Sequence, residues 1–249
     1  MKLMFFGRGS GFTDDHTSAY FVTPNNDLVL IDCPVTTFLK LMEFDFQKYN
    51  KVYVHITHMH GDHIGGLSLF LQYMYFTQKK RVYVVAPSIN VLNRLRSLLT
   101  FEGTNPSWYI IGTTFDITNC EWHKADIKTI HSPELDGMCF GLWLSVDNTN
   151  IVYTGDTATL NPFIPYLYPG TELYVDVSVH YGQIHLKLEE ILESLIELTK
   201  KGVKIYLMHL DDVKAANKIV KNIPNIEIVS CISDKSRIII HLKDVPQED

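Results

Sequence analysis

The chain has 249 residues, 46% of them hydrophobic and 12% aromatic, which is enough to bury a sizeable core. Lys and Arg number 22 against 28 Asp and Glu, and the formal net charge of −6 disfavours nucleic acid as a partner. No apolar run approaches the roughly 20 residues of a membrane-spanning helix, and no Pro-, Gly- or Ser-rich tract separates two domains. We expect one domain over residues 1–249 that does not enter a membrane.

The cysteines and the start of the chain bear on the cellular compartment. The cysteines form no CxxC pair, and the apolar start meets Gly7 and Gly9 before it reaches the length of a signal peptide. The sequence therefore predicts a reduced, cytoplasmic protein.

The amino-terminal segment predicts a strand, a loop and a hairpin. A short strand over Lys2–Phe6 is followed by the loop Gly7–Thr17, whose glycines could cradle a phosphate although their spacing fits neither a P-loop nor a dinucleotide fingerprint. The strands Ala19–Thr23 and Leu28–Ile31 flank the turn sequence PNND. They deliver Asp32 to a strand end, where its carboxylate either orients a metal-bound imidazole or caps the helix predicted directly after it.

The sequence THMHGDH is a dense group of metal-ligating side chains, and it directly follows the predicted buried strand Lys51–Ile56. His58 and His60 point the same way from an extended segment, whereas Asp62 and His63 fall where the chain turns into a helix. One short turn can therefore face two metal ions. A polar surface loop explains the group poorly, because crowded imidazoles repel one another when protonated and lack partners when neutral.

Strand and helix then alternate. The helical run Ile64–Phe76, the strand Arg81–Ala86 and the helix Ser88–Leu99 follow one another, the last with Ser88 as its cap. The pattern loosens from Phe101 to Asn119, where aromatic residues predict a lid over a site, an oligomer contact or ordinary core packing.

Three later strands also end in a candidate ligand. They are Cys120–Ile130 followed by His131, Ile151–Thr154 followed by Asp156, and Val203–Met208 followed by His209. The middle strand pairs with Phe140–Val146 in a predicted hairpin. Asp156, backed by Gly155, is well placed to bridge two cations. Taken alone this aspartate is better explained by a turn, but the other motifs favour a ligand.

A further histidine precedes a helix. The strand Glu172–Val179 leads to the helix Leu186–Lys200, whose apolar positions recur at helical spacing and pack one face on a sheet. His185 stands at the start of this helix, where it serves either as a cap or as a proton donor to a leaving group. Two more strands are predicted over Ile226–Cys231 and Arg237–Leu242.

Together these motifs resemble the metallo-β-lactamase superfamily. The resemblance rests on HxHxDH, TGDT, MHL and the opening LIDC, which occur in the family's order over nearly the whole chain. It implies an α/β fold of the four-layer αββα sandwich type and two bound zinc ions, with manganese as the alternative metal. By resemblance, one zinc is held by His58, His60 and His131, the other by Asp62, His63 and His209, and Asp156 bridges them.

Within the superfamily the chain is most similar to the tRNase Z-like phosphodiesterases. The start FFGRGSG with TSAY resembles their amino-terminal motif, with His16 in place of the more usual asparagine, and His185 matches their late catalytic histidine. The tRNA-processing members carry an extended arm between the equivalents of His131 and Asp156, where this chain has room only for a hairpin. A small acidic chain without the arm is most like the anti-Pycsar cyclic-nucleotide phosphodiesterases, which phages and some bacteria use to destroy cyclic pyrimidine signals.

The resemblance implies a zinc phosphodiesterase with Asp62 and His185 as catalytic residues. We expect hydrolysis of 3′,5′-cyclic nucleotides to nucleoside 5′-monophosphates, with cyclic CMP and UMP as the first candidates and cyclic AMP and GMP as further ones. Members of this branch are commonly homodimers, so a second copy is the expected partner, in the host cytoplasm if a phage encodes the chain. The alternatives are a tRNase Z-like RNA 3′-processing endonuclease, a thioester or lactam hydrolase, and a non-catalytic protein that binds a nucleotide signal.

Overall fold

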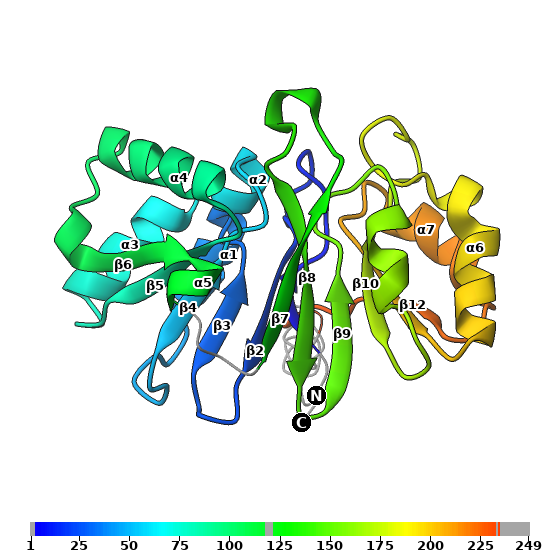
Figure 1. Cartoon of the computed structure of the whole chain (residues 1–249), viewed down its shortest axis with the longest axis horizontal. Helices are drawn as coiled ribbons and strands as arrows, with labels where there is room; N and C mark the ends of the chain where they lie inside the picture. The colour runs from blue at the N-terminus through cyan, green and yellow to red at the C-terminus, as the bar shows by residue number, and fades with distance from the viewer. Residues whose placement is uncertain (1–2, 118–121, 233, 235–249) are drawn as a thin grey trace, which may run out of the picture.

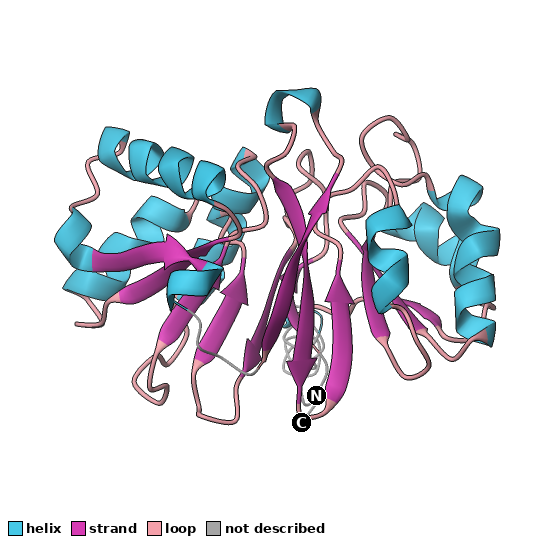
Figure 2. Cartoon of the chain, in the orientation of Figure 1, coloured by secondary structure: helices cyan, strands magenta, loops and turns pink. Residues whose placement is uncertain are grey.

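The computed structural model describes residues 3–117, 122–232 and 234. Two six-stranded sheets pack face to face, and helices cover the outer face of each sheet (Figures 1 and 2). The expected αββα sandwich is therefore confirmed. No helix in the described part of the chain is long and apolar enough to cross a membrane.

The first sheet contains the amino-terminal strands in chain order. They are β1 (Met4–Gly7), β2 (Ser18–Val22), β3 (Leu28–Ile31), β4 (Val52–His55), β5 (Val82–Ala86) and β6 (Tyr109–Thr113). The strands β1 to β3 are antiparallel, whereas β3 to β6 run parallel, so that the carboxyl ends of the parallel strands share one edge. The helices α1 (Val35–Leu41), α3 (Leu67–Phe76) and α4 (Ile89–Phe101) contribute apolar side chains to the core on this sheet's outer face.

The second sheet repeats this arrangement with the later strands. They are β7 (His123–Thr129), β8 (Cys139–Val146), β9 (Thr149–Tyr153), β10 (Glu172–Asp176), β11 (Lys204–Met208) and β12 (Ile226–Ile228). The strands β7 to β9 are antiparallel, whereas β9 to β12 run parallel. The helices α6 (Leu188–Lys200) and α7 (Val213–Val220) and the 3₁₀ helix η3 (Asn161–Tyr166) pack on its outer face.

Alternating side chains build separate core layers. In β4, Val52 and Val54 pack toward the helices, whereas Tyr53 enters the layer between the sheets. That layer is rich in aromatic residues, and its Tyr153 and Tyr174 are fully buried. The sheets are therefore tied together by a continuous apolar interior.

Several predicted boundaries differ from the structure. The helical run after the histidine motif is two helices, α2 (Gly61–Ile64) and α3, because the amide of Gly66 donates to the carbonyl oxygen of Cys33 at 2.9 Å instead of continuing the helix. The loosened segment after α4 contains η1 (Pro106–Trp108), β6 and α5 (Thr114–Ile117), and Tyr109 is buried. Core packing therefore accounts for Tyr109, while residues 118–121 and the strand predicted over 237–242 lie outside the described residues.

Candidate metal centre and active site

The candidate ligands converge at one edge of the sandwich. The segment between β4 and α3 supplies those of the histidine motif, and the loops that follow β7, β9 and β11 supply the others. Both sheets therefore contribute candidate ligands. The structure brings together all the residues that the sequence analysis singled out as ligands, in two groups that share one aspartate: His58, His60, His131 and Asp156, and Asp62, His63, His209 and Asp156.

The first group is a cage of three imidazoles and one carboxylate. Nδ1 of His60 lies 3.1 Å from Nε2 of His58 and 3.1 Å from Nε2 of His131. Oδ2 of Asp156 lies 3.7 Å from Nε2 of His58 and 3.6 Å from Nε2 of His131. Nδ1 of His131 donates to the carbonyl oxygen of Ile184 at 2.7 Å, which leaves its Nε2 directed at the cage.

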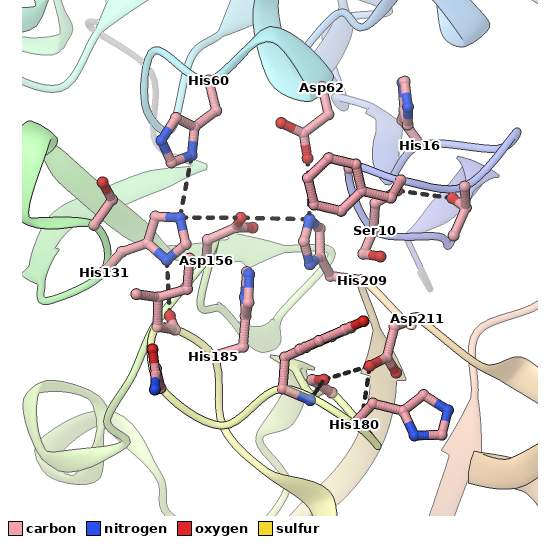
Figure 3. Close-up of a pocket in the computed structure, with 18 of the residues that line it drawn as sticks. Ser10, His16, His60, Asp62, His131, Asp156, His180, His185, His209 and Asp211 are labelled. Atoms are coloured by element: carbon pink, nitrogen blue, oxygen red, sulfur yellow. Dashed lines mark hydrogen bonds and ion pairs between the residues drawn. The ribbon is translucent and has the colours of Figure 1, made fainter.

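The second group places two carboxylates around two imidazoles. Nε2 of His63 lies 3.5 Å from Oδ2 of Asp62 and 3.3 Å from Oδ1 of Asp156. Nε2 of His209 lies 3.3 Å from Oδ2 of Asp62 and 3.3 Å from Oδ2 of Asp156. Figure 3 shows Asp156 between His131 and His209, so its carboxylate faces both groups.

These distances fit metal coordination. In a tetrahedral zinc site with bonds of about 2.0–2.2 Å, ligand atoms are separated by about 3.3–3.6 Å. The distances above fall in or near this range. Those from Oδ2 of Asp156 to Nε2 of His58 and of His131, 3.7 and 3.6 Å, are too long for hydrogen bonds. Nε2 of His63 is fully buried and has no hydrogen-bond partner among the described residues. A cation between the ligand atoms would complete both groups, and the nitrogen and oxygen donors suit zinc.

The electrostatics of the groups also suit a cation. Burial lowers the pKa of His58, and the nearby His63 lowers it further, so that the imidazole offers a free lone pair. Burial alone would raise the pKa of the Asp156 carboxyl, but His209 and His63 hold it well below its usual range. The centre therefore combines a neutral imidazole with an ionised carboxylate at its middle.

Asp32 orients one of the imidazoles. Its Oδ2 accepts a hydrogen bond from Nδ1 of His63 at 2.8 Å, and the Thr57 amide and hydroxyl donate to its two oxygens at 2.8 and 2.7 Å. Its backbone has φ 62°, a left-handed conformation that is uncommon for a residue other than glycine. Of the two roles that the sequence left open for Asp32, the structure supports orientation, because Pro34 occupies the cap position of α1.

His185 lies beside both groups. Its ring centroid is 4.8 Å from that of His131 and 4.9 Å from that of His209. Its Nδ1 donates to Oδ2 of Asp176 at 2.8 Å. Burial alone would lower the pKa of His185, but the carboxylate of Asp176 outweighs it and raises the pKa.

The sequence analysis missed Asp176. It ends β10, is fully buried, and also accepts a hydrogen bond from the amide of Thr157 at 2.9 Å. Its Oδ1 lies 3.3 Å from Nδ1 of His209. The available signal was a carboxylate that follows an apolar strand, the pattern that drew attention to Asp156, but the predicted strand continued past it to Val179.

The centre opens into a pocket of about 1360 Å³ lined by two loops (Figure 3). One is the glycine-rich loop after β1, in which the amides of Gly9 and Ser10 donate to the carbonyl oxygens of Asp15 and Leu210. These two amides are therefore not available to a phosphate, and the phosphate cradle that the glycine spacing would have allowed is not formed by them. The other loop is the segment between β10 and α6 that carries His185.

Comparison with known proteins places the chain in a family. The model of the anti-Pycsar protein Apyc1 family matches residues 1–230. The anti-Pycsar protein Apyc1 of Bacillus phage 010DV004 is 25% identical over 233 residues, which are 85% of this chain and 90% of that protein. Ribonuclease Z of Haloarcula marismortui is 27% identical over 110 residues, which are 43% of this chain and 35% of the ribonuclease.

Solved structures agree on the fold. The metallo-β-lactamase fold protein YhfI from Bacillus subtilis superposes with a TM-score of 0.70 at 16% identity, over 91% of this chain and 94% of that chain. The ribonuclease match covers about a third of that protein, whereas the Apyc1 match extends over most of both chains. With the metallo-β-lactamase fold and the family model agreeing along nearly its whole length, the chain belongs to the anti-Pycsar protein Apyc1 family.

Proposed function

We propose that this chain is a metal-dependent phosphodiesterase that hydrolyses 3′,5′-cyclic nucleotides to nucleoside 5′-monophosphates. The observation that carries this proposal is the pair of ligand groups sharing Asp156, next to His185 and open to a pocket. Membership of the anti-Pycsar family supports a cyclic-nucleotide signal as the substrate, with cyclic CMP and UMP as the first candidates.

We infer that the two groups hold two zinc ions, with Asp156 between them. The ligand distances and the nitrogen and oxygen donors support this assignment. When bound, such a pair stabilises the charge on the phosphoryl oxygens and makes a water nucleophile available at neutral pH.

The protein's own residues direct the remaining chemistry. Nδ1 of His185 is held by Asp176, so its Nε2 is the atom left to serve the pocket. The water oxygen forms a bond to phosphorus, the bond from phosphorus to the 3′ oxygen breaks, and His185 donates a proton to that oxygen; the proton that the water gives up returns through solvent to His185 and restores the donor. Burial opposes ionisation of Asp62, but the neighbouring imidazoles of His209 and His63 hold its pKa well below its usual range. A weak base of this kind orients the attacking water by accepting a hydrogen bond.

The segment between His131 and Asp156 favours a small substrate over tRNA. Every residue from His131 to Asp156 is described, and the segment forms only η2 (Pro133–Leu135) and the β8–β9 hairpin. No extended tRNA-gripping arm is present in it. A thioester or lactam hydrolase would leave the hydrogen bond between His185 and Asp176 without a role, and a non-catalytic binding protein would not need the complete ligand set.

The expected homodimer stays a prediction. Apolar side chains on two neighbouring helices support it, namely Val35 and Leu39 of α1 and Leu69 and Phe76 of α3, which are all exposed. A second copy is a suitable partner for such a surface. The mass of the protein in solution tests this point.

Product analysis tests the proposed function. Zinc-loaded protein is incubated separately with cyclic CMP, UMP, AMP and GMP and with a precursor tRNA, and the Asp156→Ala protein is the control. We expect 5′-monophosphates and intact tRNA from the wild type, and no product from the variant. Trimmed tRNA with untouched cyclic nucleotides would instead establish the endonuclease alternative.

A further inference from the structure

Two aromatic side chains line the pocket without a function in the chemistry described above. Phe12, in the glycine-rich loop, is 103% exposed, and Tyr181, in the loop before α6, is 67% exposed. Large aromatic rings are normally buried, and an exposed ring that lines a pocket beside the candidate metal centre is a candidate contact for a ligand.

The backbone holds Phe12 close to the metal centre. A Cβ atom added to Gly11 would lie 2.9 Å from Oδ2 of Asp62, so the backbone one residue before Phe12 rests against a candidate metal ligand. The amide of Ser10 donates to the carbonyl oxygen of Leu210 at 3.1 Å, which fixes the loop on its other side. Phe12 is therefore exposed but not on a freely moving segment.

The loop that carries Tyr181 is held in a similar way by Asp211. The amides of Val179 and His180 donate to the Asp211 carboxylate at 2.8 and 3.0 Å, and the hydroxyl of Ser178 donates to it at 2.5 Å. The amide of Tyr181 in turn donates to the hydroxyl oxygen of Ser178 at 2.7 Å. This network fixes the backbone from which the tyrosine ring projects.

One short segment connects both loops to the centre. His209 is a candidate metal ligand, Leu210 holds the glycine-rich loop, and Asp211 holds the loop of Tyr181. Figure 3 shows His16 of the first loop above His209 and His180 of the second loop below it. The positions of both aromatic loops relative to the centre are thus set by three consecutive residues.

We propose that Phe12 and Tyr181 form the nucleobase-binding site of this pocket. The inference rests on the proposed function, because it assumes that the phosphate of the ligand lies at the metal centre and the base extends between the two loops. Aromatic rings bind bases by stacking, which tolerates every base because each has a π-face. Asp211 is the positioning residue that keeps the tyrosine loop in place.

Calorimetry with the zinc-loaded protein measures the contribution of the base to binding affinity separately from that of the phosphate. The probes are cytidine 5′-monophosphate and ribose 5-phosphate, which differ in the base. We expect the wild type to bind the nucleotide about tenfold more tightly, and Phe12→Ala and Tyr181→Ala to lose most of this preference. Tyr181→Phe should retain it. The matched control is Phe101→Ala, because Phe101 is 90% exposed on α4 and does not line the pocket.

Turnover gives the second readout. Loss of a stacking contact removes binding in the ground state and the transition state alike, so KM for a cyclic nucleotide should rise about tenfold in Phe12→Ala with little change in kcat. An unchanged base preference and KM in both alanine variants would overturn the proposal. So would a loss of nucleotide binding that accompanies a halved mass in solution, since Phe12 would then act at a subunit contact.

The binding comparison does not depend on hydrolysis. If the wild type cleaves no cyclic nucleotide but shows the base preference that Phe12→Ala abolishes, the proposed function fails and the base site stands. If the wild type cleaves cyclic nucleotides and the alanine variants behave like Phe101→Ala, the proposed function stands and the base site fails.

Discussion

Asp176 shows how one buried carboxylate can serve two imidazoles. One of its oxygens accepts a hydrogen bond from His185, and the other lies 3.3 Å from Nδ1 of His209. A carboxylate in this position fixes the ring orientation of both histidines and makes them more basic. The proposed proton donor, His185, and the candidate metal ligand His209 therefore both depend on Asp176, and a substitution of Asp176 should affect both.

The role of His185 can be separated from metal binding. His185→Ala should keep the full metal content and lower kcat by about 10²- to 10⁴-fold, because only the proton donor is removed. Metal analysis of the purified protein and steady-state kinetics make the measurement. Asp156→Ala is the control and should lose both metal and turnover. Retained metal with unchanged turnover in the His185 variant would refute its role as an acid.

The limits of sequence reasoning are clearest at single residues. The convergence of the candidate ligands of the histidine motif could be predicted because these residues lie within a few positions of one another, where local geometry decides the direction of their side chains. Asp32 could not be settled, because its partner His63 is 31 positions away. Their contact depends on the register of β3 and β4, which pairs Ile31 with His55 and so brings Asp32 next to the motif. Sequence alone does not reveal that register.

At the scale of elements, strands with continuous apolar runs were predicted well, including the four-residue β3, whereas β6 and α7 were not predicted. β6 was missed because its edge position leaves only part of its side chains buried. α7 was also missed, although a signal was present. Asp212 accepts a hydrogen bond from the amide of Ala215 as the helix cap, and Ala216 and Val220 recur at helical spacing.

A polar contact joins the two sheets away from the metal centre. Oδ1 of Asp126, in β7, lies 2.9 Å from Nε2 of His55, in β4, and 3.2 Å from Nε2 of His123. Burial alone would raise the pKa of the Asp126 carboxyl, but His55 and His123 hold it well below its usual value. Between its folded and unfolded pKa values the folded state binds fewer protons, so the contribution to stability is present above about pH 4 and is lost as the pH falls further.

This contact predicts a pH-dependent effect of Asp126→Asn. The free energy of unfolding of the variant should fall furthest below that of the wild type above about pH 5, and the difference should shrink as the pH decreases toward about 3. Urea unfolding of both proteins across this range gives the measurement, with chelator present so that metal binding does not contribute. A difference that stays constant with pH would contradict the assignment.

At the scale of the whole molecule, the candidate centre joins the two halves of the sandwich. The histidine motif belongs to the first sheet, and His131, Asp156 and His209 belong to the second. Buried carboxylates and imidazoles at such a junction are costly without a cation between them. A bound metal should therefore stabilise the packing of one sheet on the other, and not only the loops that hold it.

Metal removal tests this view. A chelator should lower the melting temperature by about 5–10 °C at neutral pH, and added zinc should restore it, because the ion binds the folded chain and not a preformed site in the unfolded one. Thermal unfolding with parallel metal analysis gives the measurement. The Asp156→Ala protein should show little shift. An unchanged melting temperature in the wild type after complete metal loss would mean that the bound metal does not stabilise the fold.

The division of the ligands between the halves has a consequence for biosynthesis. A ribosome releases the histidine motif early, whereas the last candidate ligand, His209, emerges when more than four fifths of the 249 residues have been made. A nascent chain that ends before this point offers an ion only an incomplete set of donors. We therefore expect firm capture of metal only in chains that have been synthesised past β11, and an incomplete set of candidate ligands in truncated products.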